Sequence, residues 1–547
     1  MPVGLLILSE KMISAIELKE VGSNQIIILV ISLTLFGVAC EVLLQYTRMK
    51  IENYNIQFGS FIQAKILKKV AFLNSKDFEK SNIYDLISRT QYDAVSGLLG
   101  NIKTLNSIIT LLVGLISYSI IIVKYDIRIL LIAMILPIIR FVFERKVGII
   151  EYNLIRENTE EERKGNYLFS LLTNAEEHKE IKQYKLFGYF IDEFVRVKKT
   201  YNKKLMNLNR KKAGIYSIII IGEEIIDFII TLLLAIQTFM GTLLIGEFIL
   251  YNNAVISLKQ NAVAMFSQLS LMYKNNMMTE QFKEFCDLKN EDLNEEGLKI
   301  DKITNIQLVN VCYRYIGQER NTLSNINLTL KSGEFIILMG YNGSGKSTLM
   351  KIIMGIYHDY SGTILVNGID LKKINIDSYR KEVSVLFQDY IKYEASITEN
   401  VGYGNIKEVN NISKIKKYLE DVFLIKFCNN MDKKLGYMFS EGQQISMGQW
   451  QKIALARALI KESTLYIFDE PNASLDLESE VGIIERIYSE LNDNIMVLIS
   501  HKFNVVFKKA DKIIVLHQGE ILEQGVHLEL LKTDGIYKKL YTLYKSI

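Results

Sequence analysis

Proline is nearly absent from this chain of 547 residues, which contains only Pro2, Pro137 and Pro471. Proline removes a backbone hydrogen-bond donor and clashes with the preceding turn, so it breaks helices. Its scarcity therefore favours long, uninterrupted helices.

Cysteine and net charge are also low. The four cysteines form no C-x-x-C pair and lie near no histidine at metal-binding spacing, so we expect inert thiols in a reducing compartment. The net charge is only +4 and the aromatic residues do not cluster with basic runs, so we expect no nucleic-acid partner.

Apolar residues, by contrast, are abundant. They make up 49% of a chain that is also 23% charged, and the mean hydropathy is +0.14. A chain of this length forms two or more domains. A composition that is both apolar and charged is typical of a membrane part joined to a water-exposed part.

Five long apolar runs lie in the first half of the sequence. A helix needs roughly 20 residues to cross a bilayer, and these runs are credible membrane spans. Buried helices of a large soluble core are the alternative, but so many long runs are hard to bury in one half of a chain. The runs cover residues 25–44, 105–123, 129–142, 213–240 and 248–272.

The N-terminal segment is too short to span a bilayer comfortably, because Ser9, Glu10 and Lys11 interrupt its apolar residues. It lacks the basic start and small-residue cleavage site of a signal peptide. We expect it to be the tail of a shortened first membrane helix.

The distribution of basic residues predicts the orientation of the spans. Residues 48–103 and 151–212 form two long segments rich in lysine and arginine, whereas the links at 124–128 and 241–247 are short. Positively charged loops remain in the cytoplasm. The two basic segments should therefore face inward, as membrane helices that continue well beyond the bilayer.

Three acidic residues stand inside one apolar run, at Glu223, Glu224 and Asp227. Carboxylates are costly in a membrane helix and normally face a cavity or a partner. One hypothesis is that they line a translocation path and attract a cationic peptide. The alternative is a structural pairing with Lys259 in the next run.

The pattern changes after an acidic, polar stretch at 290–302, which is typical of a linker. From residue 303 onward, short β-rich runs alternate with helices, and this indicates an α/β domain with a largely parallel sheet. The expected strands are 334–339, 383–387, 465–468, 495–500 and 512–517.

A phosphate-binding loop follows the strand that ends at residue 339. Its sequence matches G-x-x-x-x-G-K-[ST] between a strand and a helix, which is the context the motif requires. The glycines let backbone N–H groups face phosphate oxygens, while Lys346 neutralises them and Ser347 offers a hydroxyl to Mg²⁺. The motif comprises Gly340, Tyr341, Asn342, Gly343, Ser344, Gly345, Lys346, Ser347 and Thr348.

Two carboxylates end the strand at 465–468. Asp469 can hold Mg²⁺, and Glu470 can orient and deprotonate an attacking water, which is the pairing that phosphoryl transfer needs. Further back, Ser446 and Gly448 begin a helix and form a candidate anion site. A plain N-terminal cap is the alternative for Ser446.

Taken in order, these motifs resemble those of the ATP-binding cassette (ABC) exporters over essentially the whole chain. The resemblance implies that Tyr315 stacks on adenine and that Gln388 meets Mg²⁺. It also implies that Ser446, Gly448 and Gln449 complete a second subunit's ATP site, that Asp476 in the Ser474-Leu475-Asp476 loop crosses the dimer interface, and that His501 contacts the γ-phosphate. Glu470, His501 and Gln388 are then the catalytic residues, and Ser347, Gln388 and Asp469 the metal ligands.

The resemblance also implies an architecture. A bundle of about six membrane helices, the first shortened, would occupy 1–285, a linker 286–302, and an α/β P-loop ATPase domain 303–547. The cofactors would be ATP and Mg²⁺. Two chains, most simply identical ones, would form a dimer in the bacterial cytoplasmic membrane and bind ATP between their cytoplasmic ATPase domains. Hydrolysis would switch the membrane helices between inward- and outward-open states.

Two short segments resemble coupling elements, at 77–90 and 177–187, and 241–251 resembles the turn between the last two membrane helices. Met447 departs from the family, which usually has glycine there. We expect its bulk to slow the composite site without abolishing it.

The cargo is less well defined. Residues 435–444, running into Trp450, resemble bacterial lanthipeptide exporters. We expect no peptidase domain before the membrane part. A multidrug or lipid exporter and a non-transporting sensor or immunity component remain as alternatives.

Overall fold

The computed structural model divides into two compact units, Met1–Asn290 and Glu291–Ile547. It describes residues 2–18, 22–80, 83, 86–87, 90, 95–157, 159–439, 441–471, 477–489, 491–500 and 505–546. The division at residue 290 falls inside the segment expected to be a linker.

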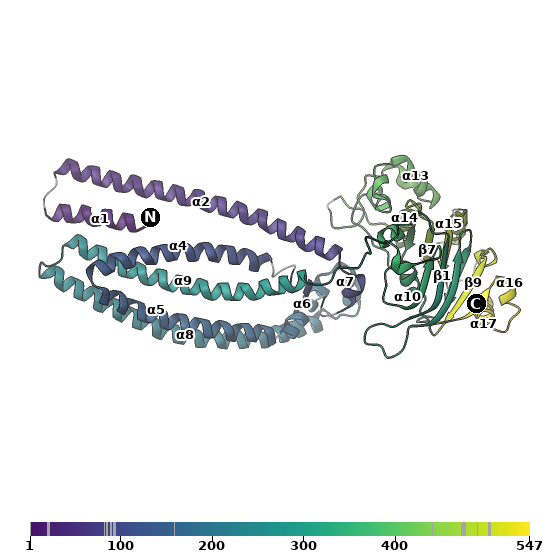
Figure 1. Cartoon of the computed structure of the whole chain (residues 1–547), viewed down its shortest axis with the longest axis horizontal. Coiled ribbons are helices and arrows are strands. Elements are labelled where there is room, and N and C mark those ends of the chain that lie inside the picture. Colours follow the sequence, from purple (N-terminus) through teal and green to yellow (C-terminus); the bar gives the residue numbers. More distant parts are fainter. Residues whose placement is uncertain are drawn as a thin grey trace. The chain divides into compact units, whose positions relative to one another are not determined.

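The first unit is helical throughout its described part (Figure 1). Helix α9 lies against α1, α4, α5 and α8. The helices are α1 (Pro2–Glu17), α2 (Ser23–Ala71), α4 (Val95–Tyr125), α5 (Ile127–Glu157), α6 (Thr159–Thr173), α7 (Ala175–Gln183), α8 (Phe187–Phe239) and α9 (Ile245–Cys286), with a short 3₁₀ helix η1 (Ser75–Glu79).

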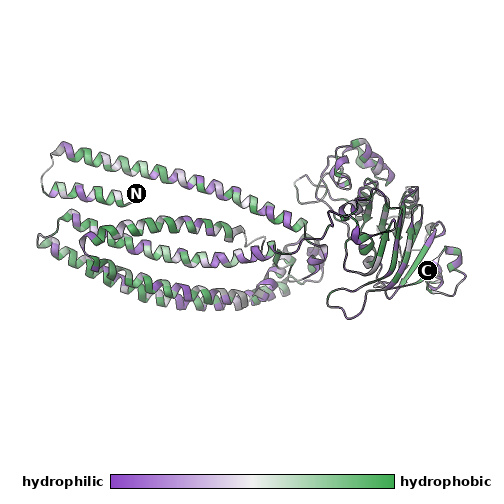
Figure 2. Ribbon diagram, viewed as in Figure 1, coloured by the Kyte–Doolittle hydropathy of each residue, from purple (hydrophilic) through white to green (hydrophobic). Residues whose placement is uncertain are grey.

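Two of these helices are much longer than a bilayer is thick. Helix α2 has 49 residues and α8 has 53, which at about 1.5 Å per residue gives roughly 70–80 Å against about 30 Å of hydrocarbon. Figure 2 shows α2 changing along its length from mainly hydrophobic to mixed polarity. The expectation that the helices continue beyond their apolar runs is therefore confirmed in α2 and α8.

Within the described residues, two helices meet a strict test of length and low charge for crossing a membrane, at 24–71 and 96–125. The other three expected spans lie in α5, α8 and α9 and carry internal charges. The turns between α4 and α5 and between α8 and α9 are short, as expected.

Helix α1 is short but continuous. It passes through Ser9, Glu10 and Lys11 without a break and has 16 residues, or about 24 Å. It packs closely on α9: a β-carbon on Gly246 would lie 2.7 Å from the Glu10 carbonyl oxygen. The Glu17 carboxylate also accepts from the Ile245 N–H at 2.8 Å, which caps the start of α9.

The charges inside the apolar helices are paired with one another. The Lys259 ammonium of α9 forms an ion pair with Asp227 of α8 and donates to the Glu223 carbonyl at 3.2 Å. Arg140 of α5 lies 3.7 Å from the Glu223 carboxylate, whereas Glu224 is exposed. The structural pairing with Lys259 is therefore confirmed, and the translocation-path hypothesis remains a prediction.

The two segments that resemble coupling elements lie between helices, the first between α2 and α4 and the second between α6 and α8. The second contains most of α7 and the turn that leads into α8. The first begins within η1, and much of the rest of 77–90 lies outside the described residues.

The second unit contains two sheets. Six strands form the larger one in the order β10-β9-β3-β8-β7-β6, and every pairing in it except β9–β10 is parallel. Its strands are β3 (Phe335–Gly340), β6 (Val383–Leu386), β7 (Leu465–Asp469), β8 (Ile495–Ile499), β9 (Lys512–His517) and β10 (Glu520–Gly525). The expected largely parallel sheet is confirmed.

The smaller sheet is antiparallel, and the sequence pattern does not predict it as a second sheet. Its order is β2-β1-β4-β5. The strands are β1 (Asn305–Tyr313), β2 (Leu323–Lys331), β4 (Ser361–Val366) and β5 (Ile369–Asp370).

Helices cover both faces of the six-stranded sheet, and alternate residues of its strands enter two separate apolar cores. Phe335, Ile337 and Met339 of β3 face one core, while Ile336 and Leu338 face the other. This alternation is the period of two expected of a strand buried on both sides. The helices are α10 (Lys346–Ile353), α11 (Ile376–Lys381), α12 (Ile397–Gly402), α13 (Ile412–Asp421), α14 (Met447–Leu459), α15 (Leu477–Ser489), α16 (His527–Leu530) and α17 (Ile536–Ser546).

The polar stretch at 290–302 is anchored to this second unit. Both terminal guanidinium nitrogens of Arg380 donate to the Glu291 carboxylate, at 3.0 and 2.7 Å, and its Nε donates to the Gly355 carbonyl. Burial raises the pKa of Glu291, but the nearby His358 and the hydrogen bonds from Arg380 outweigh it and lower the pKa to about 2. A charged clamp thus fixes the chain where it enters the ATPase unit.

The Lys259–Asp227 pair should contribute to the stability of the membrane unit. Lys259→Met leaves the partly buried Asp227 carboxylate, whose side chain is 24% exposed, without its partner. Breaking a fully buried pair costs about 3–5 kcal/mol, so a smaller loss is expected here, and the thermal unfolding midpoint of the detergent-purified chain should fall. Asp227→Asn in the same chain should restore most of it. Lys124→Met, which removes an exposed lysine, is the matched control. Equal midpoints for Lys259→Met and Lys124→Met would contradict the pairing.

The Glu291 clamp predicts a pH dependence. Its folded pKa of about 2 lies below the ordinary 4.5, so the ionised clamp stabilises the ATPase unit above pH 4.5 and this contribution disappears as pH falls towards 2. At neutral pH, Glu291→Gln should cost about 1–2 kcal/mol after allowance for solvent screening. Denaturant titrations should show the difference between variant and native chain shrinking below pH 4.5. A difference that is constant with pH would refute the assignment.

Candidate functional site

The loop between β3 and α10 has the backbone of a phosphate cradle. Gly340, Gly343 and Gly345 all have positive φ angles, of 152°, 77° and 103°. A β-carbon on Gly345 would lie 2.8 Å from Leu323 Cδ2 and 3.0 Å from the Thr322 carbonyl. Both the backbone conformation and the lack of space for a side chain therefore require glycine at position 345. The loop leads directly into the N-terminus of α10, which can bind phosphate.

Lys346 is held across this loop. Its ammonium donates to the carbonyls of Gly340 at 2.9 Å and Tyr341 at 3.0 Å, and the residue is only 7% exposed. Burial lowers the pKa of Lys346, while the charges of Asp469 and Glu470 oppose that shift. A phosphate in the cradle would be a strong partner for this cation.

The two carboxylates follow the end of β7. Burial and the neighbouring charge of Glu470 raise the pKa of Asp469 to about 6. Glu470 has a left-handed φ of 47°, and its carboxylate accepts from the Gln388 amide at 3.3 Å. Its carbonyl accepts from the Gln451 amide at 2.9 Å. The turn after β7 is thus fixed from two sides.

These groups surround one cavity of about 440 Å³. Most of the predicted nucleotide, metal and catalytic residues meet there. The lining residues are Thr322, Asn342, Gly343, Ser344, Gly345, Lys346, Ser347, Thr348, Gln388, Asp469 and Glu470. Gly340 and Tyr341 contact the ammonium of Lys346.

Tyr315 lies beside the end of the phosphate loop. Its hydroxyl is 3.1 Å from the Thr348 hydroxyl, and its ring packs edge-on against Tyr313 and Tyr357. An aromatic ring at the end of a phosphate cradle is well placed to meet a base.

The helix start at residue 446 lies apart from the described lining of this cavity. Ser446 caps α14: its hydroxyl accepts from the Gln449 N–H at 3.3 Å, and the Gln449 side chain accepts from the Ser446 N–H at 3.2 Å. The plain cap is therefore confirmed within one chain. Met447 is 53% exposed, and its carbonyl accepts from the Tyr390 hydroxyl at 3.2 Å. Gly448 occupies the first turn of the same helix.

Asp476 and His501 lie outside the described residues, as do Ser474 and Leu475. Their expected roles at a dimer interface and at the γ-phosphate stay predictions.

The donor set suits a magnesium nucleotide. Ser347, Gln388 and Asp469 bring a hydroxyl, an amide and a carboxylate to the same cavity, and Mg²⁺ prefers such oxygen ligands. No group of three His, Cys, Asp or Glu side chains suited to a metal occurs in the described part of the chain, and Mg²⁺ at phosphate sites typically uses one or two carboxylates plus phosphate oxygens. The Ser344 hydroxyl is buried without a partner among the described residues, as a phosphate donor would be.

Sequence reasoning missed Thr322 and Gln451. Thr322 precedes β2 and belongs to no motif, so its place at the cavity depends on the fold of the smaller sheet. Gln451 lies in the interior of α14, where nothing in the local pattern distinguishes it from a solvent-facing amide.

Comparisons with known proteins agree with this geometry. The family model "ABC transporter" matches residues 323–473. The subtilin transport ATP-binding protein SpaT of Bacillus subtilis is 32% identical over 551 residues, covering 99% of this chain and 89% of that protein. The nisin transport ATP-binding protein NisT of Lactococcus lactis subsp. lactis is 31% identical, covering 89% of this chain and 82% of that protein.

Two further relatives have other descriptions. The ATP-dependent lipid A-core flippase of Escherichia coli K12 is 28% identical, covering 85% of this chain and 80% of that protein. The solved structure of a bacterial Atm1-family ABC exporter with ATP bound superposes with a TM-score of 0.80 at 18% identity, covering 98% of this chain and 95% of the other. That structure shows the same fold across both units.

Lys346→Ala should reduce ATP hydrolysis by about a hundredfold or more, since a preorganised cation at the phosphates is removed. Lys351→Ala is the matched control, because Lys351 lies on the same helix but donates to the Tyr357 hydroxyl. Phosphate release by the purified chain measures both. Native rates in the Lys346→Ala protein would contradict the assignment of this cavity.

Proposed function

We propose that this chain, which belongs to the ABC transporters, exports a lanthipeptide-like peptide across the bacterial cytoplasmic membrane. It is a half-transporter, whose membrane domain is fused to an ATPase that couples hydrolysis to transport. The observation that carries the proposal is the 32% identity to a subtilin transporter over 99% of this chain. The ATPase domain would lie in the cytoplasm, where ATP is available.

Half-transporters of this family function as dimers, and we propose that the partner is an identical chain. Each ATP would lie between the Lys346 loop of one chain and the Ser446 helix start of the other. The exposed N-terminus of α14 supports this role, because the first turn of a helix attracts phosphate. Met447 would stand beside that phosphate and slow the composite site.

The cavity residues then have separate roles in binding and hydrolysing ATP. Gly343, Ser344, Gly345 and Thr348 would hold the phosphates, and Tyr315 would stack on adenine. Ser347, Gln388 and Asp469 would hold Mg²⁺, which neutralises phosphate charge when bound. Glu470 would accept a proton from the attacking water, and the 3.3 Å contact with Gln388 supports its orientation.

Loss of the γ-phosphate would remove the contacts that join the two ATPase domains. The dimer would then loosen, and the membrane helices would pass between inward- and outward-open packings. The short helix α7, between α6 and the long helix α8, is the kind of element through which such a motion could pass.

Lipid export is the second candidate, favoured by the 28% identity to lipid A-core flippases. The two cargoes differ in chemistry, because a peptide presents backbone amides and charged ends whereas a lipid presents long acyl chains.

Transport into inside-out vesicles separates these candidates. Vesicles that contain only this chain should accumulate a lanthipeptide precursor when ATP is added, and Glu470→Gln should abolish accumulation while ATP still binds, because the proton acceptor is lost. A fluorescent lipid A analogue offered to the same vesicles should not change leaflet. ATP-dependent movement of the lipid without movement of the peptide would overturn the peptide proposal.

A further inference from the structure

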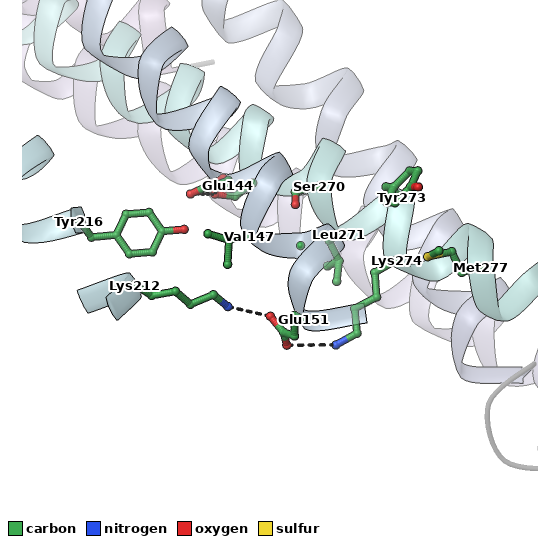
Figure 3. Close-up of a pocket in the computed structure, with 12 residues that line it drawn as sticks. Glu144, Val147, Glu151, Lys212, Tyr216, Ser270, Leu271, Tyr273, Lys274 and Met277 are labelled. Atoms are coloured by element: carbon green, nitrogen blue, oxygen red, sulfur yellow. Dashed lines mark hydrogen bonds and ion pairs between the residues drawn. The ribbon is translucent and has the colours of Figure 1, made fainter. Parts of the chain in front are cut away.

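A second cavity lies inside the membrane unit, between α5, α8 and α9 (Figure 3). Its volume is about 320 Å³, at the small end of the roughly 300–1,000 Å³ typical of ligand pockets. Its walls are mainly apolar, with charged groups gathered at two levels along the helices.

One level carries an excess of positive charge. Glu151 of α5 accepts from the Lys212 ammonium at 2.7 Å and lies 3.8 Å from the Lys274 ammonium. Figure 3 shows the two lysines reaching this one carboxylate from opposite sides. The hydrogen bond from Lys212 lowers the pKa of Glu151, so the carboxylate stays ionised. Among the described residues, these two cations and one anion leave one positive charge at this level.

The other level carries an excess of negative charge. Glu144 lies 3.4 Å from Arg140 and accepts from the Ser267 hydroxyl at 3.1 Å. Arg140 is shared, because it also lies 3.7 Å from Glu223. The next cation along α9, Lys259, is already paired with Asp227. Among the described residues, Glu144 and Glu223 therefore share one guanidinium, and one negative charge is left over.

The spacing of the two levels is set by helix geometry. Glu144 and Glu151 are seven residues apart on α5, as are Ser267 and Lys274 on α9. Seven residues are about two turns, or about 10 Å along the axis. An extended chain covers about 3.3 Å per residue, so three residues span the same distance.

Between the levels, the wall suits a small, uncharged stretch of peptide. Val147 and Leu271 supply apolar surface, and Tyr216 and Tyr273 supply rings with hydroxyl tips. Gly148 leaves space: an added β-carbon would stand 3.4 Å from the Ser270 hydroxyl, an ordinary contact. A larger side chain there would project into the cavity.

We propose that this cavity binds a peptide segment of about three residues that carries a cation at one end and a carboxylate at the other. The cation lies at Glu144, and the carboxylate lies at Lys212 and Lys274. The placement of this subsite on the route of an exported peptide rests on the proposed function, whereas the binding of the segment does not.

Trialanine is the simplest probe, because its side chains are uncharged and its charged ends stand about 10 Å apart when it is extended. Titration calorimetry on the detergent-purified full chain should detect its binding. The N-acetylated and C-amidated forms should each bind about tenfold or more weakly, since each loses one charged hydrogen bond.

Two variants assign the ends. Glu144→Gln should abolish the preference for a free amino group and keep the preference for a free carboxylate. Lys274→Gln should do the opposite, while Lys124→Gln, which removes an exposed lysine, should change neither preference. Gly148→Leu should abolish binding of all three peptides, and Gly148→Ala should retain it.

A purely structural charge network would not make Glu144→Gln and Lys274→Gln lose opposite preferences for the two peptide ends. Equal affinity for the free and blocked peptides, no binding of trialanine, or the same response in Glu144→Gln and Lys274→Gln would each overturn the proposal. ATP hydrolysis without peptide, at the native rate, verifies that each variant is folded. Binding as predicted without transport in vesicles would refute the proposed function alone, and transport without trialanine binding would refute only the subsite.

Discussion

A charge that leaves water needs a partner or a ligand, and this constraint organises both units of the chain. In the ATPase unit it holds Lys346 against two loop carbonyls and sets it opposite Asp469 and Glu470. The polypeptide alone satisfies this cavity only in part: the Ser344 hydroxyl is buried without a partner in the described chain, and Asp469 keeps a raised pKa. Phosphate and Mg²⁺ are the groups that would complete such a set. The local cost of burying these charges is therefore also the source of affinity for a nucleotide.

The membrane unit meets the same constraint with ion pairs between helices. Arg140 on α5, Glu223 and Asp227 on α8, and Lys259 on α9 join three helices whose apolar surfaces alone would not select one register. Helix association in lipid gains little from the hydrophobic effect, so packing and polar contacts decide which faces meet. Pairs of this kind can also exchange partners when helices shift, because the Arg140 guanidinium already lies near two acids, Glu144 on its own helix and Glu223 on α8. They are thus compatible with a bundle that must hold two packings.

The nucleotide site was largely predictable from the sequence because its motifs are local. Nine consecutive residues specify the loop from Gly340 to Thr348, and the strand before them fixes where they point. The smaller antiparallel sheet and the anchor between Glu291 and Arg380 were not predictable, since both depend on pairings between distant residues. Residues 290–302 have the composition of a flexible linker, yet the largely buried Glu291 pairs with Arg380, 89 positions away. Thr322 and Gln451 were missed for the same reason.

The pairing of charged residues in the apolar helices cannot be predicted from composition alone. Sequence reasoning recognised that Glu223 and Asp227 needed partners and named Lys259, but it assigned no role to Arg140 or Glu144. Which charges are neutralised depends on the count at each level of the bundle, and that count requires knowing which helices adjoin. Lys212 and Lys274 are 62 residues apart in the chain, yet both reach Glu151. The surplus of charge at each end of the α5–α8–α9 cavity is therefore a property of the folded bundle, and it is this surplus that gives the cavity a polarity a ligand could match.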